Sequence, residues 1–147
     1  MNVFRTCVAL LVILLAVFLV GCKPSTNSSV METQFKEEFG LQGVQQNFDF
    51  QEQYNSYGGI PYEGIALYSF TINQDTMLSI EAWEQLPYQA NVMDFIERVS
   101  LYISFPEIRT GRWKFIPRGS TEDEIASASL CVIDTENRRG YLLMCDT

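Results

Sequence analysis

The stretch from Ala126 to Cys145 reads ASASLCVIDTENRRGYLLMC and predicts two β-strands joined by a turn. Apolar residues dominate both ends, whereas the seven residues from Asp134 to Gly140 are mostly polar and end in glycine. A polar loop between two such runs indicates a β-hairpin, whose strands pair antiparallel. We therefore expect strands over 126–133 and 141–145, paired in an antiparallel sheet.

Two further strands are expected upstream of this hairpin. Gly111 to Ile116 surrounds Trp113 with apolar residues, and the side chains of Gly64 to Ile72 alternate between two faces, as in a strand. Residues 45–63 are rich in Gln, Asn, Tyr and Gly and show no such alternation, so we expect this segment to be irregular.

Three short helices are expected from apolar residues that recur at helical spacing. The first runs from Met31 to Gly40, and the second from Asp75 to about Trp83, with Asp75-Thr76 at its N-cap and Leu78 and Ala82 on one face. The third is capped by Asn91, and its apolar stripe consists of Val92, Phe95, Ile96 and Val99. This order predicts an α+β fold in which an antiparallel sheet of about four strands is covered on one face by two or three short helices.

Charge and composition exclude several classes of function. From Cys22 onward the chain carries 18 acidic and nine basic side chains, a net charge of −9, which repels nucleic-acid backbones. The sequence contains no histidine, so Ser-His-Asp triads, Cys-His dyads and histidine-bearing zinc sites are absent. We expect neither a metal nor another cofactor.

The N-terminus has the pattern of an export signal. Arg5 precedes fourteen consecutive apolar residues, Cys7 to Val20, and as a helix these would extend about 21 Å, too short for about 30 Å of hydrocarbon. Leu19-Val20-Gly21-Cys22, which follows, resembles the lipobox of bacterial lipoproteins. The alternative is an uncleaved hydrophobic helix that ends in a free Cys22 thiol.

The lipobox resemblance implies cleavage after Gly21 and attachment of acyl chains to Cys22, which would anchor the protein on the extracytoplasmic side of a bacterial membrane. Lys23, in place of aspartate, implies the periplasmic face of the outer membrane if the source has two membranes. The expected organisation is a signal peptide at 1–21, a lipidated cysteine with a flexible polar spacer at 22–30, and one globular domain at 31–147. Scattered motifs also resemble a small exported bacterial domain: Trp83 with Leu86-Pro87, Gly111-x-Trp113-Lys114-Phe115 and Asp146-Thr147.

Cys131 and Cys145 are the two cysteines of the domain, one on each strand of the hairpin. A pairing register centred near Arg138 would place them opposite each other, and export favours a disulfide. The alternative is a pair of buried, reduced cysteines that act as small apolar residues. A redox-active pair has little support, because the Cys-x-x-Cys spacing and a basic neighbour are both missing.

Aromatic residues interleaved with Gln, Asn, Ser and Gly between Phe48 and Tyr62 are typical of binding loops. Tyr54, Tyr57 and Tyr62 are therefore candidate partner-binding residues. The alternative is that the rings of this segment pack inward over the sheet.

The leading functional hypothesis is a non-enzymatic envelope lipoprotein that binds a partner. A first alternative is an inhibitor or immunity protein, because a domain of charge −9 can attract a basic toxin or lysozyme-like enzyme. A second is a carboxylate-dependent glycan hydrolase, for which Glu81 with Glu84, or Asp134 with Asp146, are candidate pairs. Glu122-Asp123-Glu124 lacks the spacing of a calcium loop, so we expect a solvated acidic loop there.

Overall fold

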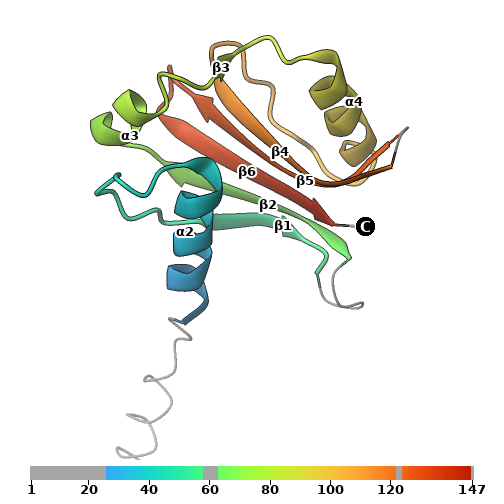
Figure 1. Cartoon of the computed structure of the whole chain (residues 1–147), viewed down its shortest axis with the longest axis horizontal. Coiled ribbons are helices and arrows are strands. Elements are labelled where there is room, and N and C mark those ends of the chain that lie inside the picture. Colours follow the sequence, from blue (N-terminus) through green and yellow to red (C-terminus); the bar gives the residue numbers. More distant parts are fainter. Residues whose placement is uncertain (1–25, 58–62, 122–123, 147) are drawn as a thin grey trace, which may run out of the picture. The chain divides into compact units, whose positions relative to one another are not determined.

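The computed structural model describes residues 26–57, 63–121 and 124–146, and the chain divides into two compact units, Met1–Met31 and Glu32–Thr147. The second unit contains a six-stranded sheet in the order β1-β2-β6-β5-β4-β3, in which every neighbouring pair is antiparallel (Figure 1). The described elements are, in chain order, α2 (Thr26–Phe39), β1 (Gln51–Asn55), β2 (Gly64–Thr71), α3 (Gln74–Ser79), β3 (Glu84–Gln85), α4 (Ala90–Val99), β4 (Gly111–Thr121), β5 (Glu124–Asp134) and β6 (Arg139–Asp146).

The prediction of an α+β fold with an antiparallel sheet is confirmed, but the expected number of about four strands is wrong. The two additional strands are both edge strands that local sequence patterns do not reveal. All five residues of β1 are exposed, so its sequence QEQYN shows no apolar alternation. β3 has two residues, too few for any periodicity.

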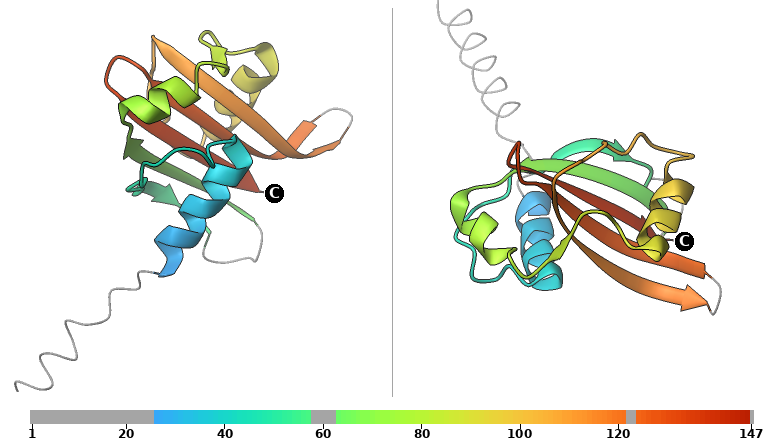
Figure 2. Two further views of the ribbon diagram at one scale, coloured as in Figure 1. Left: turned by 60° about the vertical axis from the view of Figure 1, so that its left-hand side comes forward. Right: turned by 90° about the horizontal axis from the view of Figure 1, so that it is seen from above.

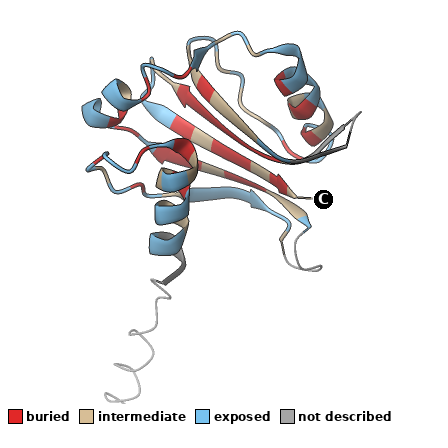
Figure 3. Cartoon of the chain, viewed as in Figure 1, coloured by how far each residue is buried: buried red, intermediate tan, exposed pale blue. Residues whose placement is uncertain are grey.

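Helices cover both faces of the sheet, and not one face as expected. On one face, Val92, Phe95 and Val99 of α4 share a buried cluster with Leu67 and Leu143. On the other, Phe35 of α2 packs with Phe48, Phe50 and Phe70, at ring centroid distances of 5.1 to 5.3 Å. Leu67 and Phe70 are three residues apart on β2 and so point to opposite faces. Figure 2 shows α2 and α4 on opposite sides of the strands, and Figure 3 shows burial concentrated along the central strands.

α2 begins earlier than the sequence predicts. Residues from Thr26 to Val30, expected to belong to a flexible spacer, form its first turns. Phe35 and Phe39, four residues apart on this helix, are buried, with exposed fractions of 2% and 1%.

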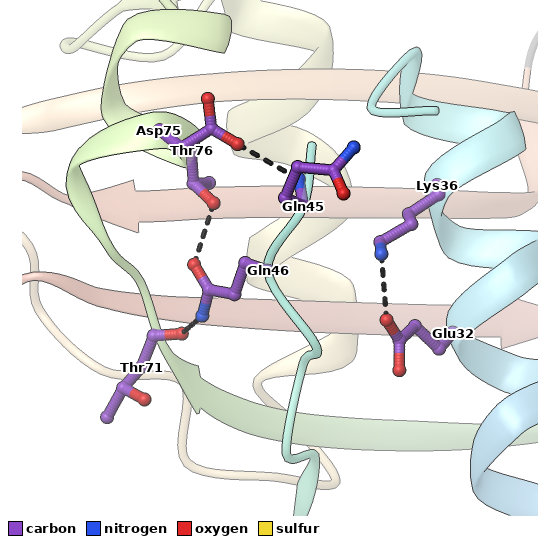
Figure 4. A network of polar contacts seen from close by, with 7 residues as sticks. All are labelled: Glu32, Lys36, Gln45, Gln46, Thr71, Asp75 and Thr76. Carbon is purple, nitrogen blue, oxygen red and sulfur yellow. Dashed lines mark hydrogen bonds and ion pairs between the residues drawn. The ribbon is translucent and has the colours of Figure 1, made fainter. Parts of the chain in front are cut away.

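α3 is fixed by a polar network rather than by an apolar face. Leu78, expected to point inward, is 58% exposed, whereas Thr76 is fully buried. The N-cap is Asn73, whose side chain accepts a hydrogen bond from the Thr76 amide at 2.9 Å. Gln46 Oε1 accepts from the Thr76 hydroxyl at 2.7 Å, and Gln46 Nε2 donates to the Thr71 carbonyl at 2.6 Å (Figure 4). The segment that precedes β1 is thereby attached to the end of β2.

α4 follows the prediction closely. Val92, Phe95 and Val99 are buried, as the apolar stripe predicts. The cap position differs by two residues: Gln89 is the N-cap and makes no side-chain capping bond, while Asn91 lies exposed in the first turn.

Candidate functional site

The outer edge of β4 is largely without a strand partner. β5 pairs with β4 along its length, but β3 pairs with β4 at Arg112 and Trp113 alone. The Leu86 amide donates to the Gly111 carbonyl at 3.1 Å, so the backbone of Gly111 points toward β3. The N–H and C=O groups of successive residues point to opposite edges of a strand. Those of Trp113 and Phe115 therefore point to the same edge as those of Gly111. No strand of the described residues lies opposite Phe115, so its N–H and C=O point out of the sheet edge.

A groove of about 620 Å³ lies along this part of β4, a volume within the range typical of ligand sites. One side of it is formed by the ends of α2 and α3 and by β3, and the other side by the start of α4. The lining residues are Phe39, Gly40, Ser79, Ala82, Trp83, Glu84, Gln89, Asn91, Val92, Trp113, Lys114, Phe115 and Pro117.

Two tryptophans hold the walls of the groove in place. Trp83 packs on Phe39 with ring centroids 5.8 Å apart, and its carbonyl accepts a hydrogen bond from Arg112 Nη1 at 2.9 Å. Trp113 Nε1 donates to the Gln85 carbonyl at 3.0 Å. Both indoles are largely buried, so the aromatic part of the groove is preformed.

Two charged side chains line the groove, Lys114 and Glu84. Lys114 Nζ donates to the Phe39 carbonyl at 3.0 Å, so its ammonium group neutralises part of the negative end of α2. Glu84 is exposed and forms no ion pair within the described part of the chain. The groove therefore carries one exposed carboxylate, that of Glu84, and one ammonium group that is bonded to the backbone.

Two of the three candidate tyrosines, Tyr54 and Tyr57, lie in the described residues. Tyr54 lies on β1 and is 38% exposed. Tyr57 is half-buried, and its hydroxyl donates to Asp146 Oδ2 at 2.7 Å. Tyr62 lies outside the described residues. Phe48 and Phe50, from the same segment, pack against Phe35 as the inward alternative predicts.

Tyr57 is held in place by both its ring and its hydroxyl. Desolvation, followed by the hydrogen bond to Asp146, raises the pKa of Tyr57 above its ordinary value. Its ring lies over Gly64, where a Cβ in place of the glycine hydrogen would approach Tyr57 Cγ to 2.8 Å. Asp146 also forms an ion pair with Arg118 at 3.3 Å. The contacts of Tyr57 are therefore those of a residue that stabilises the fold, and Tyr57 does not line the groove.

The predicted disulfide is not present: Cys131 and Cys145 are free and buried. Cys131 lies opposite Leu142, and Cys145 lies opposite Ala128. Because positions 142 and 145 are three residues apart on β6, the two cysteines point to opposite faces of the sheet. The pairing is centred between Glu136 and Asn137 rather than near Arg138. Burial raises the pKa of both thiols, as expected for inert apolar cysteines.

The carboxylate pairs proposed for a hydrolase gain no support. Asp134 lies opposite Arg139, the first residue of β6, and Asp146 is the last, so about 24 Å of strand separates them, far more than the 5 to 9.5 Å of a glycosidase pair. Glu81 and Glu84 are both exposed. Within the described residues, no group of three or more Cys, Asp or Glu could hold a metal ion. Glu122 and Asp123 lie outside them.

Comparison with family models, curated proteins and solved structures finds no match for this chain. None of the helices among the described residues has both the length and the apolar character needed to cross a bilayer. The signal segment and Cys22 lie outside the described residues.

The groove is the site that sequence patterns miss. Its residues come from five elements and their connections, over a range from Phe39 to Pro117. In the sequence, Pro117 is a signal of this site, since a proline inside a strand pattern indicates an edge strand. The two tryptophans, Trp83 and Trp113, are the other signals.

Proposed function

We propose that this protein is a lipid-anchored envelope protein that acts by binding a protein partner, without catalysis, through the groove beside β4. The observation that carries the proposal is the combination of an open strand edge at Phe115 with a preformed groove of about 620 Å³. Strand edges are ready templates for association, and most proteins cover them or fill them with charge. Here the edge at Phe115 instead opens into the groove.

The anchor is Cys22, through acyl chains added after cleavage at Gly21. The lipobox resemblance of Leu19 to Cys22 supports this part of the proposal, and it implies the extracytoplasmic side of a bacterial membrane. Cys22→Ser should abolish both membrane fractionation and lipid labelling. Retention of both would mean that the apolar segment itself spans the bilayer.

A basic partner is the best match for the charge of the chain, which is −9 from Cys22 onward. Glu84, exposed in the groove, supports the same choice locally. An inhibitor or immunity protein against a basic enzyme is one form of this function. Complex formation should then weaken on raising salt, and indifference to salt would contradict a basic partner.

Site-specific photocrosslinking in cells that produce the chain tests the proposal. A photoreactive residue in place of Asn91 should crosslink to a partner, because Asn91 is exposed and lines the groove. The matched control replaces Gln51, which is exposed on β1 at the opposite edge of the sheet. Equal crosslinking at both positions, or none at Asn91, would overturn the groove as the binding site.

A further inference from the structure

We infer that the groove takes an extended peptide segment of the partner, which adds as a short strand to the edge of β4 at Phe115 and carries a cationic side chain next to apolar ones. This inference rests on the proposed function, because it specifies how a partner is held at the same groove.

The backbone of β4 provides the hydrogen-bonding groups that strand addition needs. Phe115 presents an outward N–H and an outward C=O two residues beyond Trp113, whose pairing with Glu84 is the last one with β3. An added strand would continue the line of β3 where the chain itself turns away toward α3. Main-chain bonds would give such a segment affinity, and side-chain pockets would give it specificity.

Pro117 limits how much strand can be added. It has no N–H to donate, and the β4–β5 register shifts immediately after it. The usable edge is therefore short, which fits a peptide segment and prevents a long edge-to-edge ladder with a second copy. A second copy would also bring its own helices against the walls that flank this edge.

The walls of the groove suit the alternating side chains of an extended segment. One set of side chains would lie on the side of Ala82 and Trp83, where Ala82 is exposed. The other set would lie on the side of Gln89 and Asn91, which are both exposed at the start of α4. Apolar residues at every second position would therefore lie on the side of Ala82 and Trp83.

The exposed Glu84 carboxylate at one end of the groove favours a cationic residue there. Lys114 is already bonded to the Phe39 carbonyl, whereas the Glu84 carboxylate is exposed and has no ion-pair partner in the described residues. Glu81, three residues earlier, is exposed as well. A lysine or arginine of the segment beside Glu84 complements this end of the groove.

Random dodecapeptides displayed on phage, selected against the full chain in detergent micelles, provide the probe. We expect selected peptides with a Lys or Arg next to alternating apolar residues. N-methylation of each peptide amide in turn should weaken binding about tenfold at the amide that donates to the Phe115 carbonyl and have little effect at the two neighbouring amides. On binding, exchange of the Phe115 amide hydrogen should slow, while the Lys114 and Ile116 amides, which point toward β5, serve as unchanged internal controls.

Glu84→Gln should weaken binding of these peptides about threefold at low salt, and Glu52→Gln on β1 should not. Strand addition is overturned if no peptide is selected, if no single N-methylation weakens binding more than those at its neighbours, or if Phe115 exchange is unaffected. If strand addition is wrong but a partner still fills the groove in another way, crosslinking from position 91 should persist. Absence of that crosslink would contradict the proposed function itself.

Discussion

The Tyr57 hydroxyl donates a 2.7 Å hydrogen bond to Asp146 Oδ2 and so joins the segment after β1 to the end of β6, 89 residues later. Arg118 of β4 completes the contact from the other side, through an ion pair with Asp146 at 3.3 Å. Three segments that are distant in the sequence meet at this carboxylate. The tyrosine expected to contact a partner therefore contacts the protein's own C-terminal strand.

Tyr57→Phe should lower the free energy of unfolding by about 1 kcal/mol, because Asp146 loses a charge-assisted hydrogen bond in a half-buried position. Tyr54→Phe is the matched control, since Tyr54 is exposed on β1 and should tolerate the change. Chemical denaturation at pH 7 measures both. Equal stability of the two variants would mean that the Tyr57 bond does not form in solution.

Stability should fall as the pH rises above about 10, the ordinary pKa of tyrosine. Desolvation raises the pKa of Tyr57 and of Tyr88 in the folded state, so the unfolded chain loses these protons first and unfolding becomes more favourable with rising pH. Tyr88→Phe should reduce this pH dependence, because the Tyr88 hydroxyl is buried without a partner in the described residues. Tyr102→Phe, at a position that is 68% exposed, should leave it unchanged.

Gly140→Ala should destabilise the fold by about 1 to 3 kcal/mol. A Cβ at Gly140 would lie 2.2 Å from the Phe70 ring, which is itself enclosed by Phe35, Phe48 and Phe50 and has no room to move. Gly43→Ala is the control, because nothing lies within 4 Å of a Cβ there. A thermal melt of Gly140→Ala that matches the Gly43→Ala melt would contradict this packing.

Thr76→Val should cost about 1 kcal/mol of stability, since it removes the bond from the buried Thr76 hydroxyl to Gln46 Oε1 while keeping the side-chain shape (Figure 4). Thr71→Val is the matched control. Thr71 is exposed and contributes its backbone carbonyl to the network, which the substitution retains. A comparable loss in both variants would show that the exchange of a hydroxyl for a methyl group, and not the bond to Gln46, is responsible.

Cys131 and Cys145 should both react with an alkylating reagent in unreduced protein once it is unfolded. In the folded protein labelling should be slow, because both thiols are buried and burial raises the pKa of each. Mass analysis of the two cysteine-containing peptides, with and without prior reduction, measures this. If labelling requires prior reduction, the two cysteines form a disulfide, and the observed register would be contradicted.

In the C-terminal hairpin the strands could be predicted from the sequence, but their register could not. Its two strands follow from apolar runs and a polar loop, which are local features. Its register depends on Asp134 Oδ1, which accepts hydrogen bonds from the amides of Glu136 and Asn137, and on Arg138 at a φ of 52°. These contacts close a tighter turn than expected, and they place Cys131 and Cys145 on opposite faces.

By itself the sequence determined the α+β class, the apolar stripe of α4, the paired C-terminal strands and the net negative charge, because each depends on composition or on contacts close in the chain. Tertiary structure alone decided that β1 and β3 join the sheet, that α2 and α4 cover opposite faces, and that the edge of β4 stays open at Phe115. The physical reason is the same in each case. Pairing partners, covered faces and grooves depend on which distant segments meet, and periodicity within one segment does not encode that choice.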